Sequence, residues 1–382
     1  FPCLFLIISN INKRSKNTYR KKPYLINLFY VGYLFGIGFF LSGTYWISNS
    51  LEFDENLKFL IPFTIIIIPL ILGLFYGLAT LVCGKYIKLE ISSIFLFCIM
   101  LAVTDYIRSK IFTGFPWNIW AYSWSWFIEF IQILNPIGLF AYNLLIITLY
   151  CMPVILFLKI KRKTLILAII SILFLVNYLY GNYTINNNKI KTKDHVKETN
   201  FIYVKIISPN FELKYDLSEE ETLDRIKKLI RYSNIEKEKK TLFIWPEGAL
   251  SGKYFFEIKR YKDLIKKNFS SSHLIIFGVN TLDKDSEKYF NSFVIVDNNL
   301  SKKFQYDKVK LVPFGEFLPF ETKLEKLGLK KVTEGFGSFS KGNMNNTFAY
   351  NNLNIIPLIC YEIIFPELIQ KIKFKKNNLI IN

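Results

Sequence analysis

Three short segments in the second half of this 382-residue sequence each place an ionisable side chain beside apolar residues. Glu247 follows the apolar run 243–245, and Cys360 follows the apolar run 354–359. Lys308 lies in a loop whose other residues are largely apolar. Desolvation and neighbouring charges shift pKa values at such positions, so all three residues are candidates for chemistry.

A carboxylate, an ammonium group and a thiol can together transfer an acyl group without a histidine. The carboxylate accepts the thiol proton, the thiolate attacks a carbonyl carbon, and the ammonium group stabilises the oxyanion. The sequence has two histidines, His195 and His273, so a Ser-His-Asp or Cys-His mechanism has few candidates. No group of Cys and His has zinc-binding spacing, and neither a metal nor a cofactor is expected.

Cysteine usage sets Cys360 apart from the other cysteines of the chain. The other four cysteines, Cys3, Cys83, Cys98 and Cys151, lie in or at the end of long apolar stretches, where packing explains them. Cys360 has no disulfide partner in its half of the chain. Taken alone, its thiol fits either a reactive group or a buried core cysteine, and only the three segments together favour the reactive group.

The elements that position these residues alternate between strands and helices from residue 200 onward. Ser218 and Glu221 form a capping box that opens an amphipathic helix ending near Tyr232. The pattern predicts further helices over 254–267 and 365–373. It predicts strands over 201–207, 241–245, 273–279, 292–297 and 354–359, with another strand beginning at Leu379. An α/β domain over 200–382 is therefore expected.

The first half of the chain has a different composition. Residues 1–188 carry 15 basic and 6 acidic residues, whereas residues 189–382 carry 34 and 24. The whole chain is 51% hydrophobic with a mean hydropathy of +0.25, which excludes a disordered protein and argues against one water-soluble globule. The net charge of +19 divides between the halves, and basic and acidic residues are mixed, so nucleic acid is not an expected partner. A polar linker is expected over 183–199.

Residues 1–182 are predicted to form a transmembrane helical domain. About 20 apolar residues are needed to cross the hydrocarbon core of a bilayer. Complete spans are expected at about 27–48, 59–83, 89–107, 136–158 and 164–181, and residues 1–9 look like the tail of another span.

The distribution of basic residues predicts the orientation of the spans. The loops before the first complete span, after the second, and between the last two are basic, so they should be cytoplasmic. The segment 112–129 falls on the other side and holds four tryptophans, which suits an interfacial aromatic layer. By the same alternation, the α/β domain should lie on the non-cytoplasmic face.

The sequences WPEGAL, YDKVKLVPFGE and ICYE resemble the three catalytic blocks of the nitrilase, or carbon–nitrogen hydrolase, superfamily with its Glu-Lys-Cys triad. Joined to a multi-span membrane domain, they resemble the apolipoprotein N-acyltransferase family, as do GYLFGIGFFLSGTYWI and FTGFPWNIW. The resemblance implies an α-β-β-α sandwich. It implies roles for Glu247 as general base, Lys308 as oxyanion stabiliser and Cys360 as nucleophile, and further functional positions at Glu316, Tyr361, Glu362 and Tyr215, where Tyr215 stands in a loop in which members carry Trp.

The resemblance also implies a reaction. A fatty acyl chain would pass from a membrane phospholipid to Cys360 as a thioester, and then to the α-amino group of diacylglyceryl-cysteine in an apolipoprotein. Phospholipid, apolipoprotein and bilayer are then the expected partners of a monomer in the bacterial inner membrane, with the catalytic domain on the periplasmic face. One alternative is a membrane-tethered nitrilase-type amidase. The other is an inactive truncated remnant, because members of the family continue beyond the strand at Leu379 and begin with an earlier span.

Overall fold

The computed structural model describes residues 1–18, 23–53, 55–111, 114–160, 162–195, 202–212, 214, 217–283, 285–313, 315–317, 338–343, 347–351, 353–370 and 378–382. The chain divides into two compact units, Phe1–Lys197 and Glu198–Asn382, called here the membrane unit and the α/β unit. The predicted fold class, a multi-span helical part followed by an α/β part, is confirmed.

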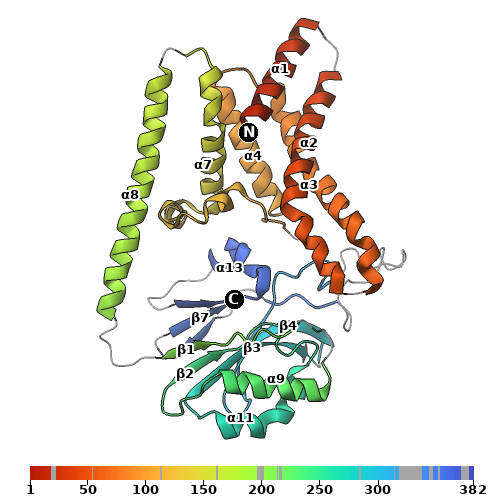
Figure 1. Cartoon of the computed structure of the whole chain (residues 1–382), viewed down its shortest axis with the longest axis vertical. Coiled ribbons are helices and arrows are strands. Elements are labelled where there is room, and N and C mark those ends of the chain that lie inside the picture. Colours follow the sequence, from red (N-terminus) through yellow and green to blue (C-terminus); the bar gives the residue numbers. More distant parts are fainter. Residues whose placement is uncertain are drawn as a thin grey trace. The chain divides into compact units, whose positions relative to one another are not determined.

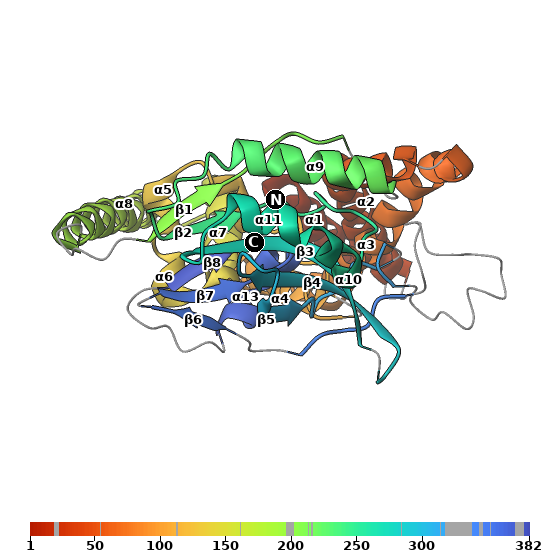
Figure 2. The same cartoon turned by 90° about the horizontal axis from the view of Figure 1, so that it is seen from below.

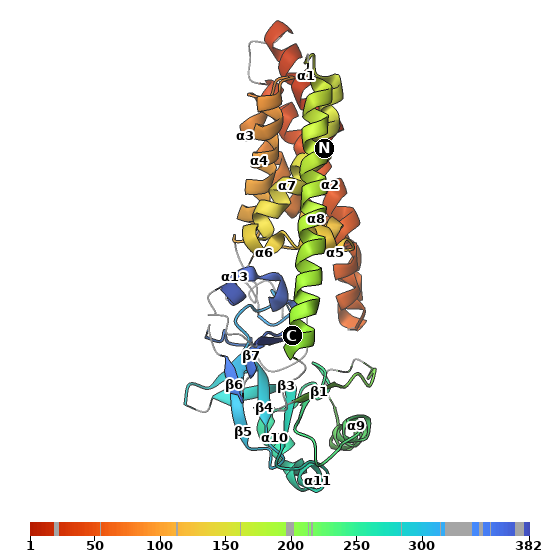
Figure 3. The same ribbon diagram turned by 90° about the vertical axis from the view of Figure 1, so that its left-hand side faces the viewer.

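The membrane unit is built from helices that run side by side in Figures 1 and 3. Five of its described segments are long and apolar enough to cross a membrane, and they overlap the five predicted spans: Tyr24–Glu52, Lys58–Gly84, Ile91–Arg108, Leu139–Phe157 and Lys163–Lys189. The α-helices are α1 (Pro2–Thr18), α2 (Pro23–Thr44), α3 (Ile61–Gly84), α4 (Ile91–Arg108), α5 (Ile128–Ile131), α6 (Leu134–Ile137), α7 (Leu139–Cys151) and α8 (Lys163–His195), joined in part by the 3₁₀ helices η1 (Tyr45–Phe53), η2 (Glu55–Leu60), η3 (Trp120–Trp124) and η4 (Met152–Phe157).

The polar stretch predicted as a linker over 183–199 is helical as far as His195, because α8 continues through it. No proline interrupts this stretch, and its Asn, Lys and Thr residues are all compatible with a helix that is already nucleated by the preceding apolar span. The boundary between the two compact units, between Lys197 and Glu198, falls inside the predicted range 183–199.

Helices α2 and α3 pack closely through glycines, as their GxxxG spacing predicts. A Cβ added at Gly36 would lie 2.9 Å from the Cα of Gly73, so a larger residue does not fit there without a shift. Thr80 of α3 adds a hydrogen bond from its Oγ1 to the carbonyl oxygen of Leu28 at 2.8 Å. Small residues allow the backbones to approach, and the hydroxyl links the two helices.

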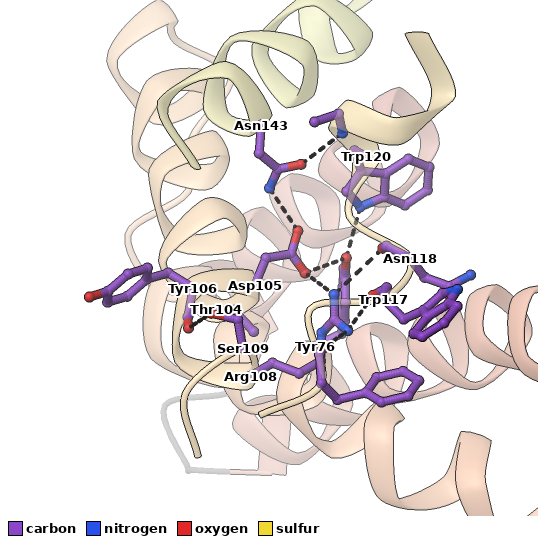
Figure 4. A network of polar contacts seen from close by, with 12 residues as sticks. Tyr76, Thr104, Asp105, Tyr106, Arg108, Ser109, Trp117, Asn118, Trp120 and Asn143 are labelled. Carbon is purple, nitrogen blue, oxygen red and sulfur yellow. Dashed lines mark hydrogen bonds and ion pairs between the residues drawn. The ribbon is translucent and has the colours of Figure 1, made fainter. Parts of the chain in front are cut away.

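A buried ion pair lies at the end of α4 (Figure 4). Arg108 Nη2 lies 3.1 Å from Asp105 Oδ1, and both side chains are 0% exposed. Arg108 Nη1 also donates to the carbonyl oxygens of Phe115 and Trp117 at 2.7 and 2.6 Å. Irregular backbone in a membrane protein needs internal partners for its carbonyl groups, and this guanidinium supplies them.

The same network extends to α3 and α7 (Figure 4). Asn143 of α7 donates to Asp105 Oδ2 at 3.0 Å and accepts from the backbone N–H of Ala121 at 3.0 Å. Tyr76 of α3 donates to Asp105 Oδ1 at 3.3 Å and accepts from Trp120 Nε1 at 2.8 Å. The network therefore fixes the aromatic segment after α4 against three helices.

The described residues of the α/β unit form two sheets. The five-stranded sheet has the order β1-β2-β3-β4-β5, with β1, β2 and β3 parallel and β4 and β5 antiparallel to their neighbours; the three-stranded sheet has the order β6-β7-β8. Their bounds are β1 Tyr203–Ile206, β2 Thr241–Ile244, β3 His273–Asp283, β4 Lys288–Val296, β5 Lys302–Asp307, β6 Phe348–Tyr350, β7 Leu353–Pro357 and β8 Asn378–Ile381. The helices are α9 Glu219–Tyr232, α10 Phe255–Ile258, η5 Lys259–Tyr261, α11 Lys262–Asn268, η7 Cys360–Ile364 and α13 Pro366–Gln370.

Alternation along the strands separates two cores, because successive side chains point to opposite faces of a sheet. Phe243, Ile275 and Phe277 pack against α9, α10 and α11 on one face. Leu242 and Ile276 point to the other face, into a cluster shared with the second sheet. Figure 1 shows α9 and α11 on one side of the five-stranded sheet and β7 on the other, and Figure 2 looks at these layers from the side of α9 and α11. These are three of the four layers of the α-β-β-α sandwich that the resemblance implies.

Two strands, β5 and β6, were not predicted, and the helix predicted over 254–267 is divided into α10, η5 and α11. Lys302–Asp307 is polar along most of its length, so it lacks an alternating apolar pattern, although its pairing with β4 holds it in the sheet. The capping box at Ser218 is confirmed, since Glu221 N donates to Ser218 Oγ and Ser218 N donates to Glu221 Oε2.

Candidate active site

Glu247 lies in a tight turn directly after β2. The backbone N–H of Ala249 donates to the carbonyl oxygen of Pro246 at 3.3 Å, and Gly248 has φ +72°. A positive φ at the third residue is what a type II turn requires, and glycine adopts it without strain. The turn therefore presents Glu247 at the carboxyl end of a buried strand.

Lys308 follows the last residue of β5. Strand β5 is antiparallel to β4, which is antiparallel to β3, so β5 ends at the same edge of the sheet as β2. The Lys308 side chain is 1% exposed, and its Nζ lies 2.9 Å from Glu316 Oε1. A buried ammonium group needs such a partner, because desolvation otherwise disfavours its charged form.

Glu316 is itself held by neutral donors. Asn291 Nδ2 donates to Glu316 Oε1 at 2.7 Å, and the backbone N–H of Val312 donates to Glu316 Oε2 at 2.9 Å. The backbone N–H of Lys308 donates to the carbonyl oxygen of Asn291 at 2.9 Å. Asn291 of β4 thus contacts both residues of the ion pair, Glu316 through its side chain and Lys308 through the backbone. Sequence reasoning missed it because its side chain carries no charge.

Cys360 begins the short helix η7 after β7. Its φ is +55°, a conformation that costs a residue other than glycine roughly 1–3 kcal/mol and that persists only where the surroundings enforce it. The residue keeps an exposed face, and its thiol lies close enough to the Glu247 carboxylate for each group to shift the pKa of the other. The fold therefore brings Glu247 and Cys360 together from two different sheets.

Glu362 is fully buried and accepts hydrogen bonds from three different segments. Its Oε1 accepts from the backbone N–H groups of Val309 and Lys310 at 2.7 and 2.8 Å. Its Oε2 accepts from the backbone N–H of Ile359 at 2.9 Å and from the Tyr306 hydroxyl at 3.0 Å. Glu362 therefore connects the chain on either side of Lys308 to the chain that carries Cys360.

Tyr361 lies between the same segments. Its hydroxyl donates to the carbonyl oxygen of Leu311 at 2.7 Å, and the Nζ of Lys308 lies 5.5 Å from the centre of its ring. The predicted residues Glu247, Lys308, Glu316, Cys360, Tyr361 and Glu362 are thus gathered at one place in the α/β unit. Tyr215 lies outside the described residues. Among the residues described, no group of three or more His, Cys, Asp or Glu side chains is arranged to hold a metal ion.

Comparison with known proteins identifies the family. A family model described as the apolipoprotein N-acyltransferase N-terminal domain matches residues 16–152, and one described as carbon-nitrogen hydrolase matches residues 207–382. The chain is 32% identical over 345 residues to the apolipoprotein N-acyltransferase of Rickettsia bellii, an alignment that covers 89% of this chain and 67% of the relative. The chain belongs to the apolipoprotein N-acyltransferase family.

Other members of the family are similar over the same region. The chain is 29% identical over 356 residues to the apolipoprotein N-acyltransferase of Allorhizobium ampelinum, covering 90% of this chain and 65% of that relative. It is 30% identical over 348 residues to the protein of that name from Brucella melitensis, covering 88% and 64%. The chain therefore spans about two thirds of the length of these curated members of the family.

The charges gathered at this site shift the pKa values of its acid and its thiol. Desolvation raises the pKa of Glu247, the Lys308 ammonium lowers it, and the carboxylates of Glu316 and Glu362 raise it again, leaving it above its ordinary value. Desolvation and the Glu247 carboxylate raise the pKa of Cys360, against the Lys308 ammonium. Glu247 and Cys360 both keep solvent-exposed surface, but the atoms packed around them still disfavour their charged forms.

A carboxyl group with a raised pKa is a better base than an ordinary one, since it holds an accepted proton more firmly. Desolvation also raises the pKa of Glu362, while the donated N–H bonds of Lys310, Ile359 and Val309 lower it. The site therefore contains one carboxylate in reach of the thiol, Glu247, and two that are occupied by backbone and side-chain donors.

Proposed function

We propose that this chain carries the reaction site of an apolipoprotein N-acyltransferase, which moves a fatty acyl chain from a membrane phospholipid to the α-amino group of diacylglyceryl-cysteine in apolipoproteins. One observation carries the proposal: Glu247, Lys308 and Cys360 converge in the α/β unit of a chain that also has five membrane-length apolar helices. A thiol with a neighbouring base and ammonium suits acyl transfer, and the apolar helices suit lipid substrates.

The first half of the reaction acylates the thiol. Glu247 accepts the Cys360 proton, and the thiolate sulfur attacks the ester carbonyl carbon of the phospholipid. Lys308 stabilises the negative charge that develops on the carbonyl oxygen. The carbon–oxygen ester bond then breaks, and the leaving alkoxide takes the proton from Glu247, which releases a lysophospholipid and leaves a thioester on Cys360.

The second half transfers the acyl group to nitrogen. The neutral α-amino group attacks the thioester carbonyl carbon, Glu247 accepts the ammonium proton, and the carbon–sulfur bond breaks. Glu247 returns its proton to the Cys360 sulfur, so the enzyme is restored and an amide is formed. The neighbouring residues Glu316, Glu362 and Tyr361 hold Lys308 and Cys360 in place for both halves.

The membrane context follows from the same proposal. In this proposal the protein is a monomer in the bacterial inner membrane. Its α/β unit lies on the periplasmic face, because the basic loops between the spans favour the cytoplasmic side. Reporter fusions within residues 202–212 test this orientation. A cytoplasmic reporter signal would overturn both the orientation and the proposed substrates.

The alternative function is a nitrilase-type amidase, in which water replaces the amine in the second half. The two differ in the fate of a labelled acyl chain when the protein is incubated with phospholipid and a diacylglyceryl-cysteine peptide. The proposal predicts label in the peptide amide, and loss of that label in Cys360→Ala. Label recovered only as free fatty acid would support the hydrolase and contradict the transferase.

A further inference from the structure

Arg225 of α9 holds the backbone of two loops at the edge of the five-stranded sheet. Its Nη2 donates to the carbonyl oxygen of Glu212 at 2.7 Å, in the loop after β1. Its Nη1 donates to the carbonyl oxygens of Ala249 and Gly248 at 3.2 and 3.4 Å, in the loop after β2. The guanidinium carbon also lies 4.8 Å from the centre of the Phe211 ring.

The second of these loops is the turn that presents Glu247. The entry to the turn is fixed by the sheet, because the backbone N–H of Trp245 donates to the carbonyl oxygen of Ile276 at 2.9 Å. The exit has no strand to hold it. There the carbonyl oxygen of Gly248 accepts from Ser251 Oγ at 2.7 Å, and Arg225 reaches the carbonyl oxygens of both Gly248 and Ala249.

The geometry requires an arginine rather than any cation. A guanidinium is planar and offers five donors in a fixed fork, so it can bind carbonyl groups in two loops at once. An ammonium group on a flexible chain can occupy one of these positions but does not span both. The Phe211 ring lies beside the guanidinium and limits its motion.

We propose that Arg225 is a positioning residue for Glu247. By holding the exit of the turn, it keeps the carboxylate in reach of the Cys360 thiol, and it ties that turn to the loop after β1. The inference rests on the proposed role of Glu247 as the base, and it adds a residue that acts on the reaction only through that base.

The test measures how fast iodoacetamide alkylates Cys360 as a function of pH, read on the Cys360 peptide by mass spectrometry. The reaction needs no lipid and reports how readily Glu247 takes the proton of the Cys360 thiol as the sulfur attacks. The variants are Arg225→Met, Arg225→Lys, Glu247→Gln and the double variant of Arg225→Met with Glu247→Gln. Arg231→Met is the matched control, because Arg231 is on the same helix but contacts Tyr232 instead, through its hydroxyl at 3.3 Å and its ring at 5.0 Å.

Arg225→Met should slow alkylation at neutral pH by about tenfold, with recovery at alkaline pH where the thiol ionises without a base. Arg225→Lys should be intermediate, and Arg231→Met should match the wild type. The double variant should equal Glu247→Gln, because both changes act on one base. A wild-type profile for Arg225→Met, or a loss of the same factor at every pH, would overturn the inference alone. If the pH profile of Glu247→Gln matched that of the wild type, the proposed base would be overturned, and the role of Arg225 with it.

Discussion

The Glu362 carboxylate accepts a hydrogen bond from the backbone N–H of Val309 at 2.7 Å. Val309 directly follows Lys308, and Glu362 lies two residues after Cys360. This bond joins segments from two different sheets, so a buried carboxylate that does not reach the thiol sets the spacing between the ammonium group and the nucleophile. Because most of its partners are backbone N–H groups, Glu362 must supply the acceptor oxygens of a carboxylate as well as fill the space.

Glu362→Gln should destabilise the α/β unit by about 2 kcal/mol, because the amide NH₂ faces backbone donors and leaves at least one buried N–H without an acceptor. Thermal unfolding measures this loss. Glu367→Gln is the control: its carboxylate pairs with Lys310 at 3.3 Å and is 20% exposed, so the cost should stay under about 1 kcal/mol. Equal costs for the two variants would remove the special role assigned to Glu362.

Lys308→Met should slow acylation of Cys360 by roughly 10²–10³ across the whole pH range, since the thioether cannot stabilise an oxyanion at any pH. The rate of thioester formation from phospholipid measures this. Lys310→Met is the control from the same loop, because its Nζ points to Glu367, and it should react at nearly the wild-type rate. Full alkaline recovery of the Lys308→Met rate would instead indicate that Lys308 acts only by favouring ionisation of the thiol and does not stabilise the oxyanion.

Glu247→Gln should alter the pH dependence of stability. The folded pKa of Glu247 is raised, mainly by desolvation, so the folded protein holds this proton more firmly than the unfolded chain does. The stability that the protonated form contributes is complete below the unfolded pKa of about 4.3 and is lost as pH rises through the folded value. The unfolding temperature of Glu247→Gln, relative to that of the wild type, should therefore increase as the pH is raised from 4 to 8. A constant difference over that range would show that Glu247 has an ordinary pKa in the folded protein.

Arg108→Met should destabilise the membrane unit by about 3–5 kcal/mol, because it leaves Asp105 charged and buried and removes donors from the carbonyl groups of Phe115 and Trp117. Unfolding in detergent, followed by tryptophan fluorescence, measures this. The matched control is Lys58→Met, which breaks an ion pair of the same i,i+3 spacing at an exposed site. That variant should differ little from the wild type, and similar losses in both would contradict the structural role of the buried pair.

The sequence predicted the parts of this protein that depend on local pattern. Long apolar runs indicated the spans, short apolar runs indicated β2, β3 and β7, and the three motifs indicated Glu247, Lys308 and Cys360. It did not predict β5, whose polar residues are held by pairing with β4. It also did not predict Asn291 and Arg225, because their partners are distant in sequence and largely backbone atoms, which leave no spacing to detect.

Cys360 should carry the acyl group, and intact-protein mass spectrometry after incubation with phospholipid tests this. We expect one fatty acyl adduct that maps to Cys360 and that neutral hydroxylamine removes, as it does from thioesters. The adduct should be absent from Cys360→Ala and unchanged in Cys3→Ala, which removes the other exposed thiol among the described residues. A thioester adduct that persists in Cys360→Ala would contradict the role of Cys360 as the acyl carrier.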